Sequence, residues 1–221
     1  DLQLGFSVSS LTIVAALAMM FSGPLSDKYG RKLVLKYCAL IFTVSAIGSA
    51  LATGFTSFLI FRMLGGLGVG ASLIVAPMYI AEIEPASKRG RLVSFNQLNI
   101  VLGITIAFFT NYYILSLADH TSSWVSNYGI AEHNWRWMLG IEALPAIVYF
   151  FALFSVPKSP RWLMSKGNEN KATAVLQRFI SVEETAEEIK AIKAALNNVN
   201  SSRKTPITEL FKPAKYSGGA R

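Results

Sequence analysis

Residues 23–32 read GPLSDKYGRK, and this short polar stretch interrupts a sequence that is otherwise strongly apolar. Residues 2–26, which end just before Asp27, contain no charged side chain. Residues 37–61, which follow the stretch, contain none either. An uncharged apolar run of about 18 residues or more is long enough to cross a lipid bilayer as a helix. The stretch is therefore predicted to be a tight loop between two membrane-spanning helices.

Further apolar regions extend this pattern. Residues 63–81, 92–118 and 143–157 also lack charged side chains, and the run at 37–61 divides at a turn, residues 53–57. Hydrophobic residues make up 52% of the 221 residues and charged residues 15%, too few for the surface of a soluble domain. The sequence predicts an all-α polytopic membrane protein with additional cytoplasmic helices. Its five transmembrane helices are expected near residues 5–26, 33–53, 57–82, 92–117 and 136–156.

The chain divides into two regions by composition. Residues 1–156 form the predicted transmembrane bundle, whereas residues 157–221 are rich in Lys and Glu and are expected to form a cytoplasmic helical linker domain. In the second region, Ser181 and Glu184 have the spacing of a capping box at the start of an amphipathic helix. The chain opens with Asp1 rather than Met, so we expect it to be a fragment.

The net charge of +8 is distributed so that it distinguishes the two sides of the membrane. All but two of the 21 Lys and Arg residues lie in the 27–36 loop, the 84–91 loop or the region after residue 157. Because Lys and Arg accumulate in cytoplasmic loops, we expect these regions in the cytosol and the Asp1 end outside a cell membrane. The expected partner of the spans is the lipid bilayer; nucleic acid is not expected, and no oligomer is required.

The sequence lacks the signatures of a metal site or a catalytic centre. Its single cysteine, Cys38, lies in a predicted span, and its two histidines, His120 and His133, lie in the predicted outer loop. We therefore expect neither an enzyme nor a bound cofactor. Gly66 and Gly70 have the small-xxx-small spacing that lets two helices approach closely, which we interpret as packing.

The stretch at 23–32 resembles the signature loop of the major facilitator superfamily, with Gly23, Asp27, Gly30 and Arg31 at the matching positions. The residue types suit such a loop, since Gly30 permits a tight turn and Asp27 can pair with Arg31. A basic loop that serves only membrane topology is the alternative interpretation.

Two further stretches resemble signatures of the sugar porter family within this superfamily. They are residues 77–82, PMYIAE, and residues 156–163, VPKSPRWL, and residues 135–137 extend the resemblance over nearly the whole chain. The resemblance implies helices two to six of the N-terminal half together with the intracellular helical domain. The first helix and the C-terminal half are not in this sequence.

The resemblance implies a carrier that moves a sugar or related polyol by alternating access, with the substrate held between two halves near the bilayer midplane. Proton-coupled symport is expected, so a proton gradient takes the place of a cofactor. A facilitative uniporter and a transport-defective sugar receptor on the same scaffold are the alternatives. A membrane-embedded enzyme would need a polar catalytic cluster, which these spans lack.

A cytoplasmic gate is expected where Arg31, Glu82 and Arg89 meet at the ends of adjacent spans. In the family such groups form an inner ion-pair network that holds the two halves together, and Arg91 and Arg161 belong to the same signatures. A solvated basic face with one Glu is the alternative.

Arg62 and Glu142 are predicted to lie at similar depth from the outer edge of the membrane, about 9 Å for Arg62. An ionisable residue at that depth usually faces the bundle or a cavity, so the two side chains can pair. Snorkelling of Arg62 to the interface is the alternative. Proton-coupled relatives place an Asp of the first helix opposite the position of Arg62, so the resemblance implies a role for this region in proton coupling.

Gln97 matches the family glutamine that hydrogen-bonds sugar hydroxyls. Two turns further on, Ile104 lies on the same helix face, where some proton-coupled relatives have a second glutamine. Without the resemblance, an amide in a span is as well explained by helix–helix association. A departure from the family concerns Lys158, where Glu is usual; it replaces an acidic residue of the gate by a basic one.

Overall fold

The computed structural model describes residues 2–83, 89–118, 125 and 127–201, and its regular structure over these residues is helical. The helices of the apolar region are α1 (Leu2–Tyr29), α2 (Arg31–Leu51), α3 (Phe55–Ile83), α4 (Arg89–Ala118), α6 (Asn134–Ile141) and α7 (Ala143–Ser155). After α7 come α8 (Pro160–Ser165), α9 (Glu169–Leu176) and α10 (Val182–Ser201).

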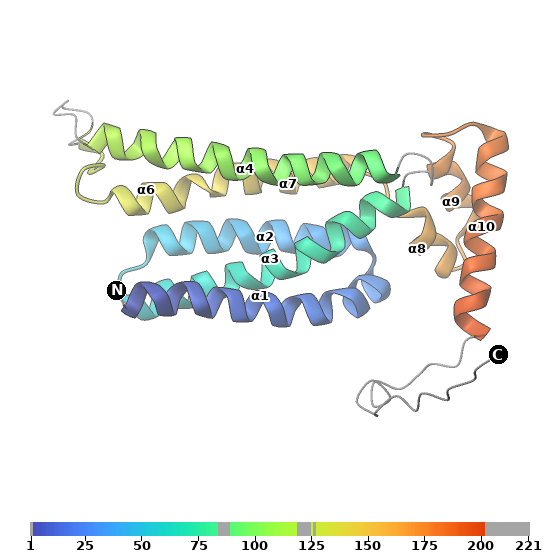
Figure 1. Ribbon diagram of the computed structural model, residues 1–221, viewed down its shortest axis with the longest axis horizontal. Coiled ribbons are helices and arrows are strands. Elements are labelled where there is room, and N and C mark those ends of the chain that lie inside the picture. Colours follow the sequence, from blue (N-terminus) through green and yellow to red (C-terminus); the bar gives the residue numbers. More distant parts are fainter. Residues whose placement is uncertain (1, 84–88, 119–124, 126, 202–221) are drawn as a thin grey trace, which may run out of the picture.

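Helices α1, α2, α3, α4, α6 and α7 run roughly parallel or antiparallel to one another and form a bundle (Figure 1). Within the described residues, α1, α2, α3, α4 and the α6–α7 pair are each long and apolar enough to span a membrane, which confirms the five predicted spans. Helices α8, α9 and α10 gather at the end of the bundle where α1 joins α2 and where α4 begins (Figure 1). The parts of the basic regions that the structure describes, at residues 28–36 and 158–193 and at the start of α4, therefore share one end of the molecule, as the predicted topology requires.

The boundaries of two helices differ from the prediction. Helix α1 continues through Pro24 to Tyr29, since the proline removes only one backbone donor from the helix. Helix α3 begins at Phe55 and α2 ends at Leu51, so that the α2–α3 connection lies two residues earlier than the gap between the predicted spans.

The last span is interrupted. Glu142 separates α6 from α7, with backbone angles φ −60° and ψ −22°, and it lies three residues before Pro145. Proline lacks the backbone N–H that would continue the hydrogen-bond ladder, and its ring crowds the carbonyl four residues earlier. An ionisable side chain thus stands at the weakest point of this span.

Helix α3 packs against two helices through its glycines. A Cβ at Gly66 would lie 2.6 Å from the backbone carbonyl oxygen of Leu11 in α1, and a Cβ at Gly70 would overlap that of Ala15. The small-xxx-small prediction is confirmed by this close approach. On the α2 side, the Ser45 hydroxyl donates to the Phe61 carbonyl at 2.7 Å, which fixes α3 against α2.

The larger buried cluster lies between α2, α3 and α7. Its members are Val34, Leu35, Cys38, Ala39, Val75, Tyr79, Ile83 and Leu153. The Tyr79 hydroxyl donates to the Pro157 carbonyl at 2.7 Å, so the cluster also holds the segment that leads into α8. This packing positions the charged residues at the adjoining end of the bundle.

Candidate functional site

Arg31 lies at the first position of α2 and binds acidic residues from two other segments. Its Nη2 is 2.7 Å from Asp27 Oδ1 and 2.9 Å from Glu82 Oε1, and its Nε donates to the same Glu82 oxygen at 3.1 Å. Nη1 donates to the Ser26 carbonyl at 3.2 Å. The Arg31 and Glu82 side chains are both 8% exposed, so the contact is largely shielded from solvent. The predicted meeting of Arg31 and Glu82 is confirmed.

Ser159 completes the coordination of Glu82 and was not predicted from the sequence. Its hydroxyl donates to Glu82 Oε2 and accepts the backbone N–H of Trp162 at 3.2 Å, as the N-cap of α8. Serine followed by proline at the first helical position is a recognisable helix start, so the cap could have been found. Its second role depends on Glu82, which is 77 residues away in the sequence.

Gly30 allows α8 to lie close to the α1–α2 connection. Its φ of 93° is in the region that favours glycine, and a Cβ would lie 3.0 Å from the Trp162 ring. The Trp162 indole N–H donates to the Asp27 carbonyl at 3.1 Å. Gly23, by contrast, has open space where a Cβ would stand. Residues 23–32 therefore provide Asp27 as a charge partner for Arg31, and Gly30 and the Asp27 carbonyl as a contact surface for α8.

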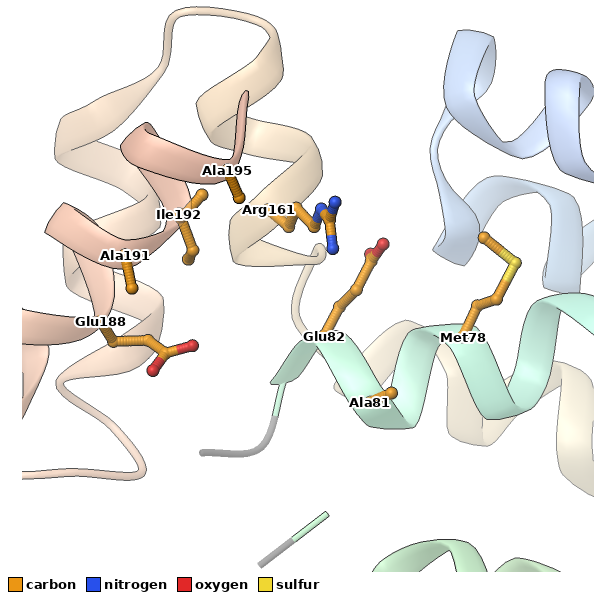
Figure 2. A pocket seen from close by; sticks show the side chains of 8 residues that line it. All are labelled: Met78, Ala81, Glu82, Arg161, Glu188, Ala191, Ile192 and Ala195. Atoms are coloured by element: carbon orange, nitrogen blue, oxygen red, sulfur yellow. The ribbon is translucent and has the colours of Figure 1, made fainter. Parts of the chain in front are cut away.

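A cavity of about 430 Å³ opens beside Glu82 between α3, α8 and α10. Figure 2 shows Arg161 and Glu82 pointing toward each other across this cavity, with Glu188 and Ile192 approaching from α10. Arg161 is exposed. The cavity thus places a second guanidinium on the open side of the buried carboxylate.

The side chains of Arg89 and Arg91 lie outside the described part of the structure. Their backbone forms the first turn of α4, at the same end of the bundle as Glu82 (Figure 1). Their predicted participation in the network stays a prediction.

Arg62 and Glu142 are near enough for their charges to interact, but they do not form the expected pair. Among the described residues, no ion pair within 4.0 Å joins them. Arg62 is half-buried and Glu142 is exposed. Glu142 thus stands between α6 and α7 without an ion pair to Arg62.

Gln97 and Ile104 lie on α4, and both side chains are exposed in this chain. Seven residues correspond to nearly two helical turns, so the two share one face of the helix. Helix α4 contacts α3 and α6. The structure therefore puts the two predicted substrate residues on a common surface without enclosing them.

Comparison with known proteins places these features in a family. Residues 1–217 match the family described as sugar (and other) transporter. The glucose transport protein of Synechocystis sp. is 42% identical over 80% of this chain and 37% of its own length. The D-xylose-proton symporter of Escherichia coli strain K12 is 36% identical over 88% of this chain and 42% of its own length.

A solved structure agrees with the sequence comparison. The major facilitator superfamily proton:xylose symporter XylE bound to 6-bromo-6-deoxy-D-glucose aligns with a TM-score of 0.81 and 33% identity, over 90% of this chain and 44% of that one. The chain thus spans less than half the length of these relatives. Its helices have the major facilitator superfamily architecture, and it is a multi-pass membrane protein. On the evidence of the family match, the apolar helices and the aligned fold, the chain belongs to the sugar (and other) transporter family.

Proposed function

We propose that the complete protein carries a sugar or related polyol across the cell membrane by alternating access, coupled to protons. The observation that carries this proposal is the network centred on Arg31 and Glu82, which ties the α1–α2 connection, α3 and α8 into one unit. Carriers need such a reversible contact at one end of the bundle, because their two halves rock around a site near the midplane. The similarity to a proton:xylose symporter that binds a glucose analogue supports a sugar as the substrate.

The network is suited to a gate because its charges are matched but costly to separate. Removing one partner of a buried ion pair leaves the other charge without compensation, at a cost of about 3–5 kcal/mol. Arg161, across the cavity from Glu82, is a candidate alternative partner when the first contact opens (Figure 2). With α8–α10 on the cytosolic side, as the basic residues favour, this network is the cytoplasmic gate.

Gln97 is the proposed sugar contact, and Ile104 is the proposed determinant of which hydroxyls are recognised. A side-chain amide both donates and accepts hydrogen bonds, as does each hydroxyl of a sugar. Arg62 and Glu142 are the proposed coupling residues, since ionisable residues within spans typically mark ion or proton pathways. Their nearby but unpaired placement suits groups that exchange partners during a cycle.

Uptake into proteoliposomes that contain the complete carrier tests the proposal. Labelled D-xylose, D-glucose and a polyol are supplied with and without an inward proton gradient, and liposomes without protein serve as the control. Symport predicts sugar accumulation only with the gradient. Equilibration that ignores the gradient indicates a uniporter, and binding without uptake indicates a receptor. If none of the substrates binds or enters, the proposed function is wrong.

A further inference from the structure

Three lysines beside the gate lack acidic partners. Lys32 Nζ donates to the Phe154 carbonyl at 3.1 Å, Lys36 Nζ lies 3.3 Å from the centroid of the Phe154 ring, and Lys158 Nζ lies 5.3 Å from that of Trp162. In the described residues, no carboxylate is within 4.0 Å of any of the three lysine nitrogens. The carboxylates of Asp27 and Glu82 bind Arg31 instead. The lysines therefore form a cluster of positive charge without a counter-ion in the described chain.

The lysine cluster lines a cavity of about 240 Å³ at the start of α2. Gly30 is the N-cap of α2, and no side chain caps this helix end. The first backbone N–H groups of a helix point along its axis and carry the positive end of the helix dipole. The cavity is thus lined by the first turn of α2, from Gly30 to Leu33, and by three lysines. This combination favours an anion with several acceptor oxygens, such as a phosphate.

An apolar groove of about 750 Å³ lies next to this cavity, between α1, α2 and α3. Its walls are α1 and α2, including Leu17 and Phe21 on one side and Ile41 on the other, and Leu67 of α3 forms part of its floor. Tyr29 and Leu33 line both the groove and the lysine cavity, so the two adjoin. The groove lies along membrane-spanning helices, and the lysine cavity that adjoins it is also lined by Trp162 of α8.

We propose that the groove and the lysine cavity together bind one anionic phospholipid, with its phosphate among Lys32, Lys36 and Lys158 and an acyl chain between α1 and α2. A phosphodiester brings the negative charge and acceptor oxygens that this cavity lacks, and a fatty acyl chain matches the apolar walls. Zwitterionic lipids bind less tightly, since their second, cationic group is repelled by the lysines. The lipid belongs to the leaflet at the α8 end. This site does not depend on the identity of the transported sugar.

Lipid binding to the purified complete carrier tests the headgroup contact. Native mass spectrometry with dioleoyl phosphatidylglycerol and dioleoyl phosphatidylcholine gives the preference between a charged and a zwitterionic headgroup. Lys36→Gln is expected to reduce the preference for phosphatidylglycerol about fivefold, and Lys32→Gln or Lys158→Gln similarly. Lys28→Gln is the matched control, because Lys28 has the same charge at the end of α1 but lines neither cavity. An equal loss in Lys28→Gln would mean that the preference reflects general surface charge, and it would overturn the proposal.

Two further arms test the acyl chain and the source of the phosphate. Ala18 lines the groove and Ala16 does not, so Ala18→Trp is expected to weaken binding of both lipids at least fivefold, whereas Ala16→Trp leaves it unchanged. Melting temperatures of both variants are compared with the wild type, and a fold defect in Ala18→Trp leaves the lysine variants to decide. Soluble glycerol 3-phosphate at the lipid concentration is not expected to compete. Competition by it, or unchanged lipid binding in all three lysine variants, would overturn the lipid site.

Discussion

The charged network at the α8 end and the proposed sugar-binding surface of α4 differ in how many of their polar groups find partners within this chain. At the α8 end, Arg31 uses three of its nitrogen atoms, and Glu82 uses both carboxylate oxygens, on partners from four segments. Along α4, by contrast, Gln97 and Ile104 are exposed. Only 6% of the residues in an apolar 18-residue stretch of α4 are buried, compared with 44% in the corresponding stretch of α2. The polar groups of the network thus have their partners within this chain. The proposed sugar contacts instead lie on an exposed surface that a substrate or further protein can cover.

The difference separates two kinds of functional residue. A buried charge has to be matched where it stands, because an unmatched one is costly, so the gate residues also hold the fold together. An exposed amide on a membrane helix can be lost with little effect on packing. Substitutions at the α8 end and at the α1–α3 contact should therefore act on stability, and substitutions on α4 should act on binding.

The largest effect is expected at the contact between α1 and α3. Gly70→Ala should destabilise the complete carrier by at least about 3 kcal/mol, because the new Cβ overlaps the Ala15 carbonyl and forces two backbones apart. Gly103→Ala is the control on α4, where nothing lies within 4 Å of an added Cβ. It should leave stability unchanged or raise it by about 0.5–1 kcal/mol. Thermal unfolding in detergent measures both, and similar melting temperatures for the two variants would contradict the close α1–α3 approach.

The second effect concerns the buried charge pair. Glu82→Ala should cost about 3 kcal/mol, since it removes the buried acidic partner of Arg31 and the acceptor of the Ser159 hydroxyl. Glu132→Ala removes an exposed carboxylate at the other end of the bundle and should change stability by less than about 0.5 kcal/mol. The same unfolding measurement applies. A Glu82→Ala variant as stable as Glu132→Ala would mean that the network does not support the fold.

A third effect should appear in sugar binding rather than in stability. Gln97→Ala should weaken sugar binding by about 1–3 kcal/mol, or roughly five- to 150-fold, because a sugar hydroxyl loses its partner in the closed site. Asn99→Ala is the control, since Asn99 is also exposed on α4 but points away from the Gln97 face. Isothermal titration calorimetry on correctly folded protein gives the affinities.

The companion substitution Ile104→Gln sharpens this test. A second amide on the Gln97 face should change the preference among sugars rather than abolish binding. Wild-type affinity in Gln97→Ala would remove that residue from the sugar site, and a lower melting temperature with normal affinity would assign it to helix association.

The smallest effect is expected where the chain departs from its family. Lys158→Glu should raise stability by about 0.5 kcal/mol, because it replaces repulsion from Lys32 by attraction at an exposed site. Lys166→Glu, at an exposed position beyond α8, should have no such effect. The difference should disappear at high salt, which screens interactions between exposed charges. A difference that persists at 1 M salt would argue against an electrostatic origin.

Local sequence determined the number, order and approximate limits of the membrane-spanning segments. In lipid, each backbone polar group has to be satisfied within its own helix, so uncharged runs such as residues 63–81 predict a span whatever surrounds them. The same holds for the capping box of α10, in which the Ser181 hydroxyl accepts the Glu184 N–H at 3.3 Å and the Glu184 carboxylate accepts the Ser181 N–H at 3.1 Å. Both patterns involve neighbours along the chain. The meeting of Arg31 with Glu82 was expected only through a resemblance to a family.

Only the tertiary structure decided the contacts that join distant segments. Ser159 bonds to a carboxylate 77 residues away, and Trp162 bonds to a carbonyl 135 residues away, so no local pattern could pair them. The similar depth of Arg62 and Glu142 along two helices likewise predicted an ion pair, which the described structure does not contain. Sequence periodicity reports which residues share a helix face. Which faces meet is decided by side-chain packing between helices, because contact energies depend on shape and distance across the whole bundle.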